Sequence, residues 1–400
     1  MAFLLGAVAF VVALLVSVML HEGGHLLTAK RFGMKATQYF VGFGPTLWSR
    51  TRGETEYGVK ALPLGGFVRI VGYTPLEEIP EEDRERAFYR QPAGRRAVVI
   101  SAGVVVNFVF AFLLLAVTAM TVGEFHAGTP SSTVDSVGAC VPAGASASAS
   151  TSCAGRPVSP AKAAGIQAGD RIVIFNGTPV ADWTQFRDAI DRARPGQVVP
   201  VVVERGGSRL TFRVTLAGVD GAAFIGVASK IVGRHYERLG PVAALGYAGE
   251  SLGTMLKAVG QVVVSLPQAV PKLFSPDRAS TPGGQVGSVV GATEVSGQIF
   301  SSHSSARDKT FLFLQLVVSI NVFLGALNVV PLLPLDGGHL AVVAYERVRA
   351  RLARRKGLPD PGPVDMTKLM PITYLAVLIL VGFGLLLIVA DLFNPLQIPG

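Results

Sequence analysis

Charged residues are scarce in this chain of 400 residues. Asp, Glu, Lys and Arg together make up 16% of it, against about 25% in an average soluble domain. Half of the residues are hydrophobic, which excludes disorder as the main state because disorder requires low hydrophobicity. Only two cysteines are present, too few for a small scaffold held by disulfides. The remaining class is an integral membrane protein with a soluble portion.

Four uncharged stretches are long enough to cross a bilayer, which takes about 20 apolar residues in a helix. They cover residues 2–20, 97–123, 310–335 and 369–390. The first stretch lacks the basic start and the small-residue cleavage site of a signal peptide, so we expect it to remain in the mature protein. The sequence therefore predicts a polytopic α-helical membrane protein with four transmembrane helices.

Basic residues are concentrated in two of the loops and explain the net charge of +9. Residues 26–96 carry twelve Lys and Arg, and residues 344–368 carry seven. The positive-inside rule makes both loops cytoplasmic, so both termini and residues 124–309 should be extracytoplasmic. The expected partner of this charge is the lipid bilayer. No basic surface interleaved with aromatic residues indicates a nucleic-acid partner.

The outer segment divides by composition. Residues 124–159 form a linker that holds Cys140 and Cys153 in a stretch rich in Gly, Ala and Ser. An oxidising compartment would permit a disulfide between these cysteines, with two free thiols as the alternative. Residues 160–230 alternate short strands with an amphipathic helix at 182–193 and resemble a PDZ domain, which implies binding of extended peptide ends by strand addition.

The rest of the outer segment, residues 231–309, should contain a helix and a connector. Residues 236–274 are apolar on one side, with interspersed charges, and indicate a helix that lies at the outer membrane interface. A fifth span is the competing interpretation, but it would invert the orientation of the third span. Residues 276–309 are rich in Gly and Ser, and we expect them to be a flexible connection.

The first span ends in the pattern His21-Glu22-Gly23-Gly24-His25. Histidines four apart lie on one face of a helix, so both imidazoles can bind one metal ion, and the adjacent Glu22 can act as a general base. The next basic residue is Lys30, roughly 14 Å further along a helix. Ionisable groups at such a depth in a membrane are rare and usually functional, so we interpret the pattern as a metal site.

A catalytic zinc ion needs a third protein ligand and an open position. A third histidine at the spacing HExxHxxGxxH is excluded, because Thr28 and Arg31 stand where its Gly and His should be. The third apolar stretch is followed directly by one acid, Asp336, with Pro331 and Pro334 before it. The first and third spans run in the same direction, so Asp336 falls at the depth of His21 and is the expected third ligand.

These motifs resemble the site-2 protease family of intramembrane zinc metalloproteases, in its bacterial PDZ-bearing branch. His21–His25 fits the family's HExxH motif, Leu335-Asp336-Gly337 its LDG motif, and Gly103 to Phe108 its Gly-x-x-x-Asn-Phe element. Residues 41–45 and 62–68 resemble its membrane-dipping β-hairpin. The match covers most of the chain, but only one clear PDZ-like copy is present where some relatives carry two.

The resemblance implies one Zn²⁺ per chain, held by His21, His25 and Asp336, with Glu22 as the catalytic base. It also implies hydrolysis of peptide bonds in single-span regulators of the anti-sigma-factor type, after a first extracytoplasmic cut by another protease. The protein would lie in the bacterial cytoplasmic membrane, with its active site toward the cytoplasmic side. Candidate substrate-positioning residues are Asn107 and Asn328 in the spans and Leu64, Gly65, Gly66 and Phe67 in the hairpin.

Other polar residues in the sequence receive simpler interpretations. Asn321 is expected to hydrogen-bond between helices. His339 is not assigned as a ligand, because a fourth ligand would close the site. His126, His235 and His303 are interpreted as isolated surface residues. A metal-ion transporter and a membrane-anchored PDZ scaffold remain alternative functions, although no internal repeat supports the first and the second leaves His21–His25 and Asp336 unexplained.

Overall fold

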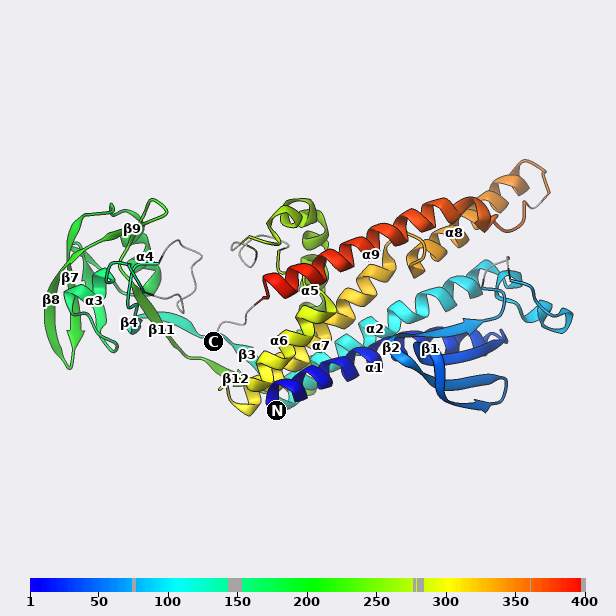
Figure 1. Ribbon diagram of the computed structural model, residues 1–400, viewed down its shortest axis with the longest axis horizontal. Coiled ribbons are helices and arrows are strands. Elements are labelled where there is room, and N and C mark those ends of the chain that lie inside the picture. Colours follow the sequence, from blue (N-terminus) through cyan, green and yellow to red (C-terminus); the bar gives the residue numbers. More distant parts are fainter. Residues whose placement is uncertain (74–76, 143–152, 276–277, 279–283, 360, 397–400) are drawn as a thin grey trace. The chain divides into compact units, whose positions relative to one another are not determined.

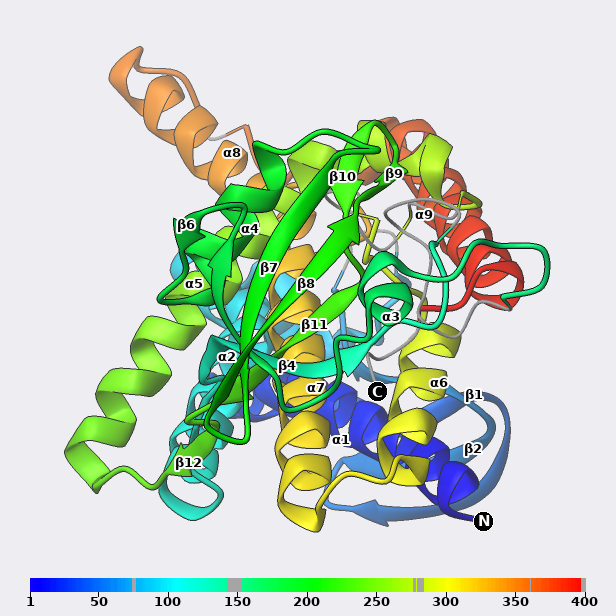
Figure 2. The ribbon, with the colours of Figure 1, turned by 90° about the vertical axis from the view of Figure 1, so that its left-hand side faces the viewer.

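The computed structural model describes residues 1–73, 77–142, 153–275, 278, 284–359 and 361–396. These residues form two compact units. The first, which we call the membrane unit, comprises Met1–Val122 and Leu239–Gly400. The second, which we call the outer unit after its predicted location, comprises Gly123–Arg238. Figures 1 and 2 show the elements of each unit, which are described separately below.

Four helices of the membrane unit are long and apolar enough to cross a membrane. They are α1 (Ala2–Arg31), α2 (Ala93–Thr121), α7 (Ala306–Val329) and the segment Met366–Phe393, which contains η5 (Met366–Leu369) and α9 (Met370–Phe393). The predicted number of spans is confirmed. Because α1 continues without interruption to Arg31, the histidine motif lies within a helix rather than at its end.

Close contacts between small residues hold the helices of the membrane unit together. A Cβ atom on Gly24 of α1 would lie 2.7 Å from the carbonyl oxygen of Ala102 in α2, so only glycine allows this approach. Asn321 of α7 donates a hydrogen bond of 2.9 Å to Ser17 of α1. This bond supports the expected role of Asn321 between helices, where membrane helices commonly associate through small and polar residues.

Helix α5 (Pro241–Ala269) packs on α2 and α7, and its buried Ala248 belongs to the hydrophobic cluster that it shares with them. It is not among the helices apolar enough to be candidate spans. The location of α5 at the membrane interface stays a prediction. A short helix, η3 (Val270–Lys272), follows it.

The expectation of a flexible connection at residues 276–309 is wrong for its central part. Helix α6 (Val289–Ser301) forms there and packs against α1, with Ser296 donating 2.8 Å to the carbonyl of Gly6. Arg278 is also buried and pairs with buried Asp391 at 2.5 Å. The Gly and Ser content that indicated flexibility instead permits close helix contact. Residues 276–277 and 279–283 lie outside the described part of the chain.

A β-hairpin lies between the first two spans, as the resemblance implied. Strand β1 (Ala36–Arg52) pairs antiparallel with β2 (Thr55–Ile70), with several register shifts. Residues 38–41 pair with both 66–69 and 56–59 of β2. Apolar side chains near the bends are exposed, including Trp48 (60%) and Leu64 (78%). Two short helices follow, η1 (Glu81–Arg86) and η2 (Phe88–Arg90).

The chain changes direction between α7 and the next helix, α8 (Asp336–Arg355). Helix α7 ends at Val329, two residues before Pro331, and Asp336 is the first residue of α8. Backbone carbonyls crowd this corner, because a Cβ on Gly337 would lie 2.2 Å from the carbonyl oxygen of Val329. The break between the two helices therefore determines where α8 begins and hence the position of Asp336.

The outer unit is an α+β fold around a six-stranded sheet. Its strands lie in the order β11-β4-β5-β7-β8, with β6 paired to β5. The strands are β4 (Thr129–Val137), β5 (Arg171–Phe175), β6 (Thr178–Pro179), β7 (Val198–Arg205), β8 (Ser208–Thr215) and β11 (Val227–Val232). Helices α3 (Pro160–Ala164) and α4 (Trp183–Asp191) and the pair β9 (Ala217–Val219) and β10 (Ala222–Phe224) complete it.

The predicted start of this domain at residue 160 is wrong. Strand β4, which was assigned to the linker, lies between β11 and β5 and contributes Val134 to the buried core. Its apolar pattern is weak because Thr and Ser occupy five of its nine positions. The first and last strands of the unit, β3 (Glu124–His126) and β12 (His235–Glu237), pair with each other in a further two-stranded ribbon.

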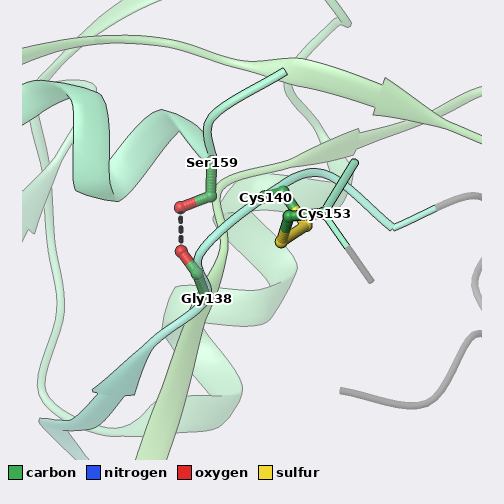
Figure 3. Close-up of a disulfide and its surroundings, with 4 residues drawn as sticks. All are labelled: Gly138, Cys140, Cys153 and Ser159. Carbon is green, nitrogen blue, oxygen red and sulfur yellow. Dashed lines mark hydrogen bonds between the residues drawn. A yellow bond between two sulfur atoms is a disulfide. The ribbon is translucent and has the colours of Figure 1, made fainter. Parts of the chain in front are cut away.

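A disulfide joins Cys140 and Cys153, whose Cα atoms lie 5.7 Å apart (Figure 3). Close by, Ser159 donates a hydrogen bond of 2.5 Å to the carbonyl of Gly138. The Gly/Ala/Ser-rich residues 143–152, part of the predicted linker, lie outside the described residues.

We expect Phe186→Ala to lower the free energy of unfolding of the outer unit by about 3–5 kcal/mol, because it empties the space of a fully buried ring. Phe186 is 0% exposed and packs against Phe175 and Trp183. The measurement is the temperature at which protease cleaves the full chain within residues 123–238. Exposed Arg187 on the same helix supplies the control, Arg187→Ala, which should leave that temperature unchanged.

Candidate active site

Two imidazoles of α1 lie on one face of the helix and meet edge to face. His21 and His25 are each 6% exposed, and their ring centroids are 4.8 Å apart. Their Nε2 atoms lie 3.2 Å from each other. The four-residue spacing thus places both nitrogens at one point, as the sequence pattern predicted.

Asp336 reaches the same point from the first turn of α8. Its Oδ2 atom lies 3.2 Å from Nε2 of His21 and 3.3 Å from Nε2 of His25. Among the described residues, this buried oxygen has no hydrogen-bond partner beyond the two imidazoles. Tetrahedral zinc with bonds of about 2.0–2.1 Å holds neighbouring ligand atoms roughly 3.3 Å apart. The three atoms therefore fit a zinc ion without rearrangement of the chain.

Both imidazoles are oriented from behind by groups of α2. Nδ1 of His25 lies 2.7 Å from the carbonyl oxygen of Val99, which can only accept, so Nδ1 carries the proton and Nε2 offers its lone pair. Nδ1 of His21 lies 3.2 Å from the side-chain amide of Asn107, which is fully buried. Such contacts commonly fix the tautomer and the ring orientation of metal-binding histidines.

Glu22 lies beside the three ligand atoms and faces a cavity. Its Oε2 accepts a hydrogen bond of 3.0 Å from the backbone N–H of Val68 in β2. The cavity measures about 190 Å³ and is lined by Glu22, His25, Val68, Ile70, Tyr73, Pro334, Asp336 and His339. A carboxylate, the candidate ligands and a strand therefore share one space, which is large enough for water and part of a peptide.

Two tyrosines outside the spans stay protonated near this cavity. Burial, with the negative charge of Glu22 as a further cause, raises the pKa of Tyr39 to about 12. Burial also raises the pKa of Tyr73, and the charges of Asp336 and Glu22 add to the shift. Tyr39 donates a hydrogen bond of 2.6 Å to the carbonyl of Met19 in α1. It thereby joins the hairpin to the helix that carries the motif.

Gly103 of α2 lies directly against the two imidazoles. A Cβ atom there would be 2.4 Å from Nε2 of His25 and 2.8 Å from Nε2 of His21. Real Cβ atoms do not approach other atoms so closely, so every side chain at this position would displace the imidazoles. Gly103 begins the Gly-x-x-x-Asn-Phe element, and Asn107 one turn later contacts His21. The element therefore supplies both the space and the support for the histidines.

Of the other polar and hairpin residues considered in the sequence, some line the cavity and others do not. Asn107 contacts His21 instead of lining the cavity. Asn328 donates 3.1 Å to the carbonyl of Leu324 in its own helix, and no described contact brings it to the cavity. Leu64, Gly65, Gly66 and Phe67 lie in β2, just before Val68. His339 lines the cavity and contacts the ring of Tyr73.

Sequence reasoning missed three supporting groups. These are the N–H of Val68, the carbonyl of Val99 and the hydroxyl of Tyr39. Two are backbone groups, which carry no residue-type signal. Tyr39 precedes the hairpin motif by two residues and could have been suspected only from its place beside that motif.

The site combines two histidines and a glutamate of one helix with a carboxylate from a distant segment. It lies in a unit with four helices long enough to cross a membrane. This combination is typical of an intramembrane metalloprotease. The chain belongs to peptidase family M50, whose family model matches residues 9–358. It is a zinc metalloendopeptidase of the site-2 protease class. The metal-ion transporter and the PDZ scaffold are therefore not favoured.

The chain is similar over its whole length to curated zinc metalloproteases. It is 35% identical over 410 residues to zinc metalloprotease Rip1 of Mycobacterium tuberculosis and 36% identical over 418 residues to Rip1 of Mycolicibacterium smegmatis, with 100% of both chains covered in each case. It is 28% identical over 427 residues to the regulator of sigma-E protease RseP of Salmonella typhimurium, with 85% of this chain and 90% of the relative covered.

We expect Gly103→Ala to lower the affinity for zinc at least tenfold, the loss that disturbed support of metal ligands typically causes. The added methyl group would occupy the space of the imidazole nitrogens, although alanine itself favours a helix. The measurement is bound zinc per chain as a function of free zinc. Gly94→Ala on the same helix is the control, because a Cβ there meets no atom within 4 Å; equal zinc binding in both variants would contradict the prediction.

Proposed function

We propose that His21, His25 and Asp336 hold the zinc ion of this protease and that Glu22 is its general base. The single observation that carries the proposal is the meeting of three ligand atoms from α1 and α8 within 4.8 Å, with Glu22 facing the adjoining cavity. Three protein ligands leave one coordination position for the reaction, as in other catalytic zinc sites.

Bound zinc supplies Lewis-acid activation of the scissile carbonyl and of water. The residues of the chain do the rest. Glu22 takes a proton from the attacking water on a carboxylate oxygen and returns it to the leaving amine nitrogen. The N–H of Val68 holds this carboxylate beside the cavity. Asn107 and the carbonyl of Val99 keep the two imidazoles in the orientation that presents Nε2 to the metal.

The side-chain amide of Asn107 supports its role behind His21. When Nε2 of His21 binds a metal, Nδ1 carries the proton and needs an acceptor. Oδ1 of Asn107 is buried and has no hydrogen-bond partner among the described residues, while Nδ2 lies 3.2 Å from Nδ1. Amide oxygen and nitrogen exchange places by a half-turn of the group. We therefore assign Oδ1 as the acceptor for Nδ1–H of His21 in the zinc-bound enzyme.

Strand β2 is the proposed docking edge for an unwound substrate. A peptide bond inside a helix has its carbonyl hydrogen-bonded and has to be exposed before attack. Residues 66–69 pair with β1 on one side, and the N–H of Val68 points to Glu22 on the other. A substrate in strand conformation could add to this second side by main-chain hydrogen bonds. Leu64, Gly65, Gly66 and Phe67 would guide it from the exposed bend.

The proposed substrates are single-span membrane regulators of the anti-sigma-factor type, trimmed first by another protease. The regulator of sigma-E protease, one of the relatives, has a name that connects such an enzyme to sigma-factor control. The outer unit would act as a PDZ-like domain that excludes untrimmed proteins or reads the new chain end. Its disulfide supports an oxidising, extracytoplasmic location.

The orientation in the bacterial cytoplasmic membrane is likewise a proposal. Basic residues end α1 at Lys30 and Arg31, begin α2 at Arg95 and Arg96, and end α8 at Arg354 and Arg355. Arg96 and Glu346 form an ion pair of 2.6 Å that joins α2 to α8. The positive-inside rule makes these ends cytoplasmic and leaves both termini outside. The active site then lies within the membrane toward the cytoplasmic side.

We expect Glu22→Gln to lower the rate of cleavage by about 10²–10⁴-fold, the usual contribution of a general base. Glutamine keeps the volume and can still accept from Val68, but it cannot take a proton. The measurement is cleavage of a single-span reporter by the full chain in reconstituted membranes, together with bound zinc per chain.

Half-buried Glu56→Gln, in β2 but outside the cavity lining, is the matched control and should cleave normally. Zinc should stay bound in Glu22→Gln. Zinc retained together with undiminished cleavage would exclude Glu22 as the base, and lost zinc would make it a ligand instead.

We expect Asn107→Ala to lower zinc affinity or cleavage by about 10–100-fold through loss of support for His21. Two buried or half-buried asparagines offer comparisons. Asn321 bonds Ser17 and Asn328 bonds its own helix, so Asn321→Ala should lower thermal stability with little change in zinc affinity, and Asn328→Ala should change neither. A direct substrate role for Asn107 would instead raise KM at unchanged zinc affinity, which would refute the assignment.

A further inference from the structure

A second cluster of metal-binding side chains lies in the outer unit, far along the chain from the zinc ligands. His126, His235 and Glu237 place their ligand atoms within 4.8 Å of one another. The expectation that His126 and His235 are isolated is wrong, because β3 pairs with β12 and sets the two residues directly opposite each other. Residues more than a hundred positions apart give no local signal of such a pair.

The ribbon of β3 and β12 presents all of these side chains on one face. His126 faces His235 and Glu124 faces Glu237 in the ladder, and alternate residues of a strand point to the same side. Phe125 and Tyr236 occupy the opposite face, with ring centroids 5.0 Å apart. One face of the ribbon is therefore aromatic, and the other carries two imidazoles and two carboxylates.

The imidazoles are prepared to bind a metal through Nε2. Nδ1 of His235 lies 2.7 Å from the carbonyl oxygen of Gly233, so it carries the proton and leaves the lone pair on Nε2. Nε2 of His126 is buried, has no hydrogen-bond partner among the described residues, and lies 3.6 Å from the carboxylate of Glu237. The rings stack with centroids 4.7 Å apart. Small side-chain rotations would bring the atoms to the spacing of roughly 3.3 Å that zinc requires.

We propose that His126, His235 and Glu237 form a second site for a divalent transition metal. The expected ion is Zn²⁺, and Glu124 is available as a fourth donor. Imidazole nitrogen with carboxylate oxygen is a donor set typical of zinc. A pair of three-residue strands is marginal by itself. Because β3 and β12 are the first and last strands of the outer unit, metal binding would clamp the two points at which the chain enters and leaves it.

The experiment counts zinc on the full chain in detergent, after chelation and titration with ZnCl₂. We expect two zinc ions per chain in the wild type and one in His235→Ala. Exposed His303→Ala is the control and should keep two. His21→Ala should lose the other ion, so the failure of either site is visible separately. A single zinc ion in the wild type that His21→Ala removes, or two in His235→Ala, would overturn the second site.

Two further measurements separate metal binding from a purely structural role of the cluster. Glu237→Gln retains the side-chain volume and should lower affinity for the second zinc ion by at least about tenfold. Zinc should also slow hydrogen exchange of the amides in residues 123–127 and 234–238 in the wild type and in His21→Ala, but not in His235→Ala. Exchange that is unaffected by zinc in His21→Ala would overturn the clamp.

Discussion

The meeting of two imidazoles and one carboxylate inside a bundle of membrane helices is the constraint on which the membrane unit depends. Ionisable groups at that depth are destabilising unless they are paired or bind a metal. His21, His25 and Asp336 come from two helices whose sequences are more than 300 positions apart, and their ligand atoms lie 3.2–3.3 Å from one another. The rest of the unit has to bring α1 and α8 to that distance.

Three features of the backbone make this approach feasible. Gly24 lets α1 lie against Ala102 of α2, and Gly103 leaves room for the imidazoles. The break at residues 330–335 ends α7 and allows α8 to begin at Asp336. Irregular backbone at membrane depth is tolerated only where it is buried in protein or beside water, and Pro334 indeed lines the cavity. The helix break is thus part of the active site.

Residue types with a fixed spacing could be interpreted from sequence, whereas contacts between distant segments could not. Hydropathy located the four spans because a bilayer demands long apolar runs. His21, Glu22 and His25 were recognisable because a helix repeats every 3.6 residues. Asp336 was found by its depth as a lone acid. The strand β4 was missed because its side chains alternate weakly, and α6 was missed because its small residues resemble those of a flexible connection.

The groups that support the histidines and Glu22 could not be predicted from the sequence. Asn107 was selected as a polar residue in a span, but only the structure places it behind His21 rather than in the cavity. The backbone groups of Val68 and Val99 have no signal in residue type at all. His126 and His235 required the pairing of β3 with β12, which depends on the whole outer unit folding between them.

The two units have separate hydrophobic cores, so a substitution that destabilises one core need not destabilise the other. Among the described residues, the core of the outer unit is built from residues between Val134 and Val227, and the clusters around the helices contain none of them. Loss of packing in one core therefore removes no contact from the other. The proposed zinc ligands all belong to the membrane unit, so the proposed recognition by the outer unit could change without altering them. Strands β3 and β12 are the first and last strands of the outer unit. A metal ion bound there would hold together the two segments by which the chain enters and leaves this unit, and it would leave both cores intact.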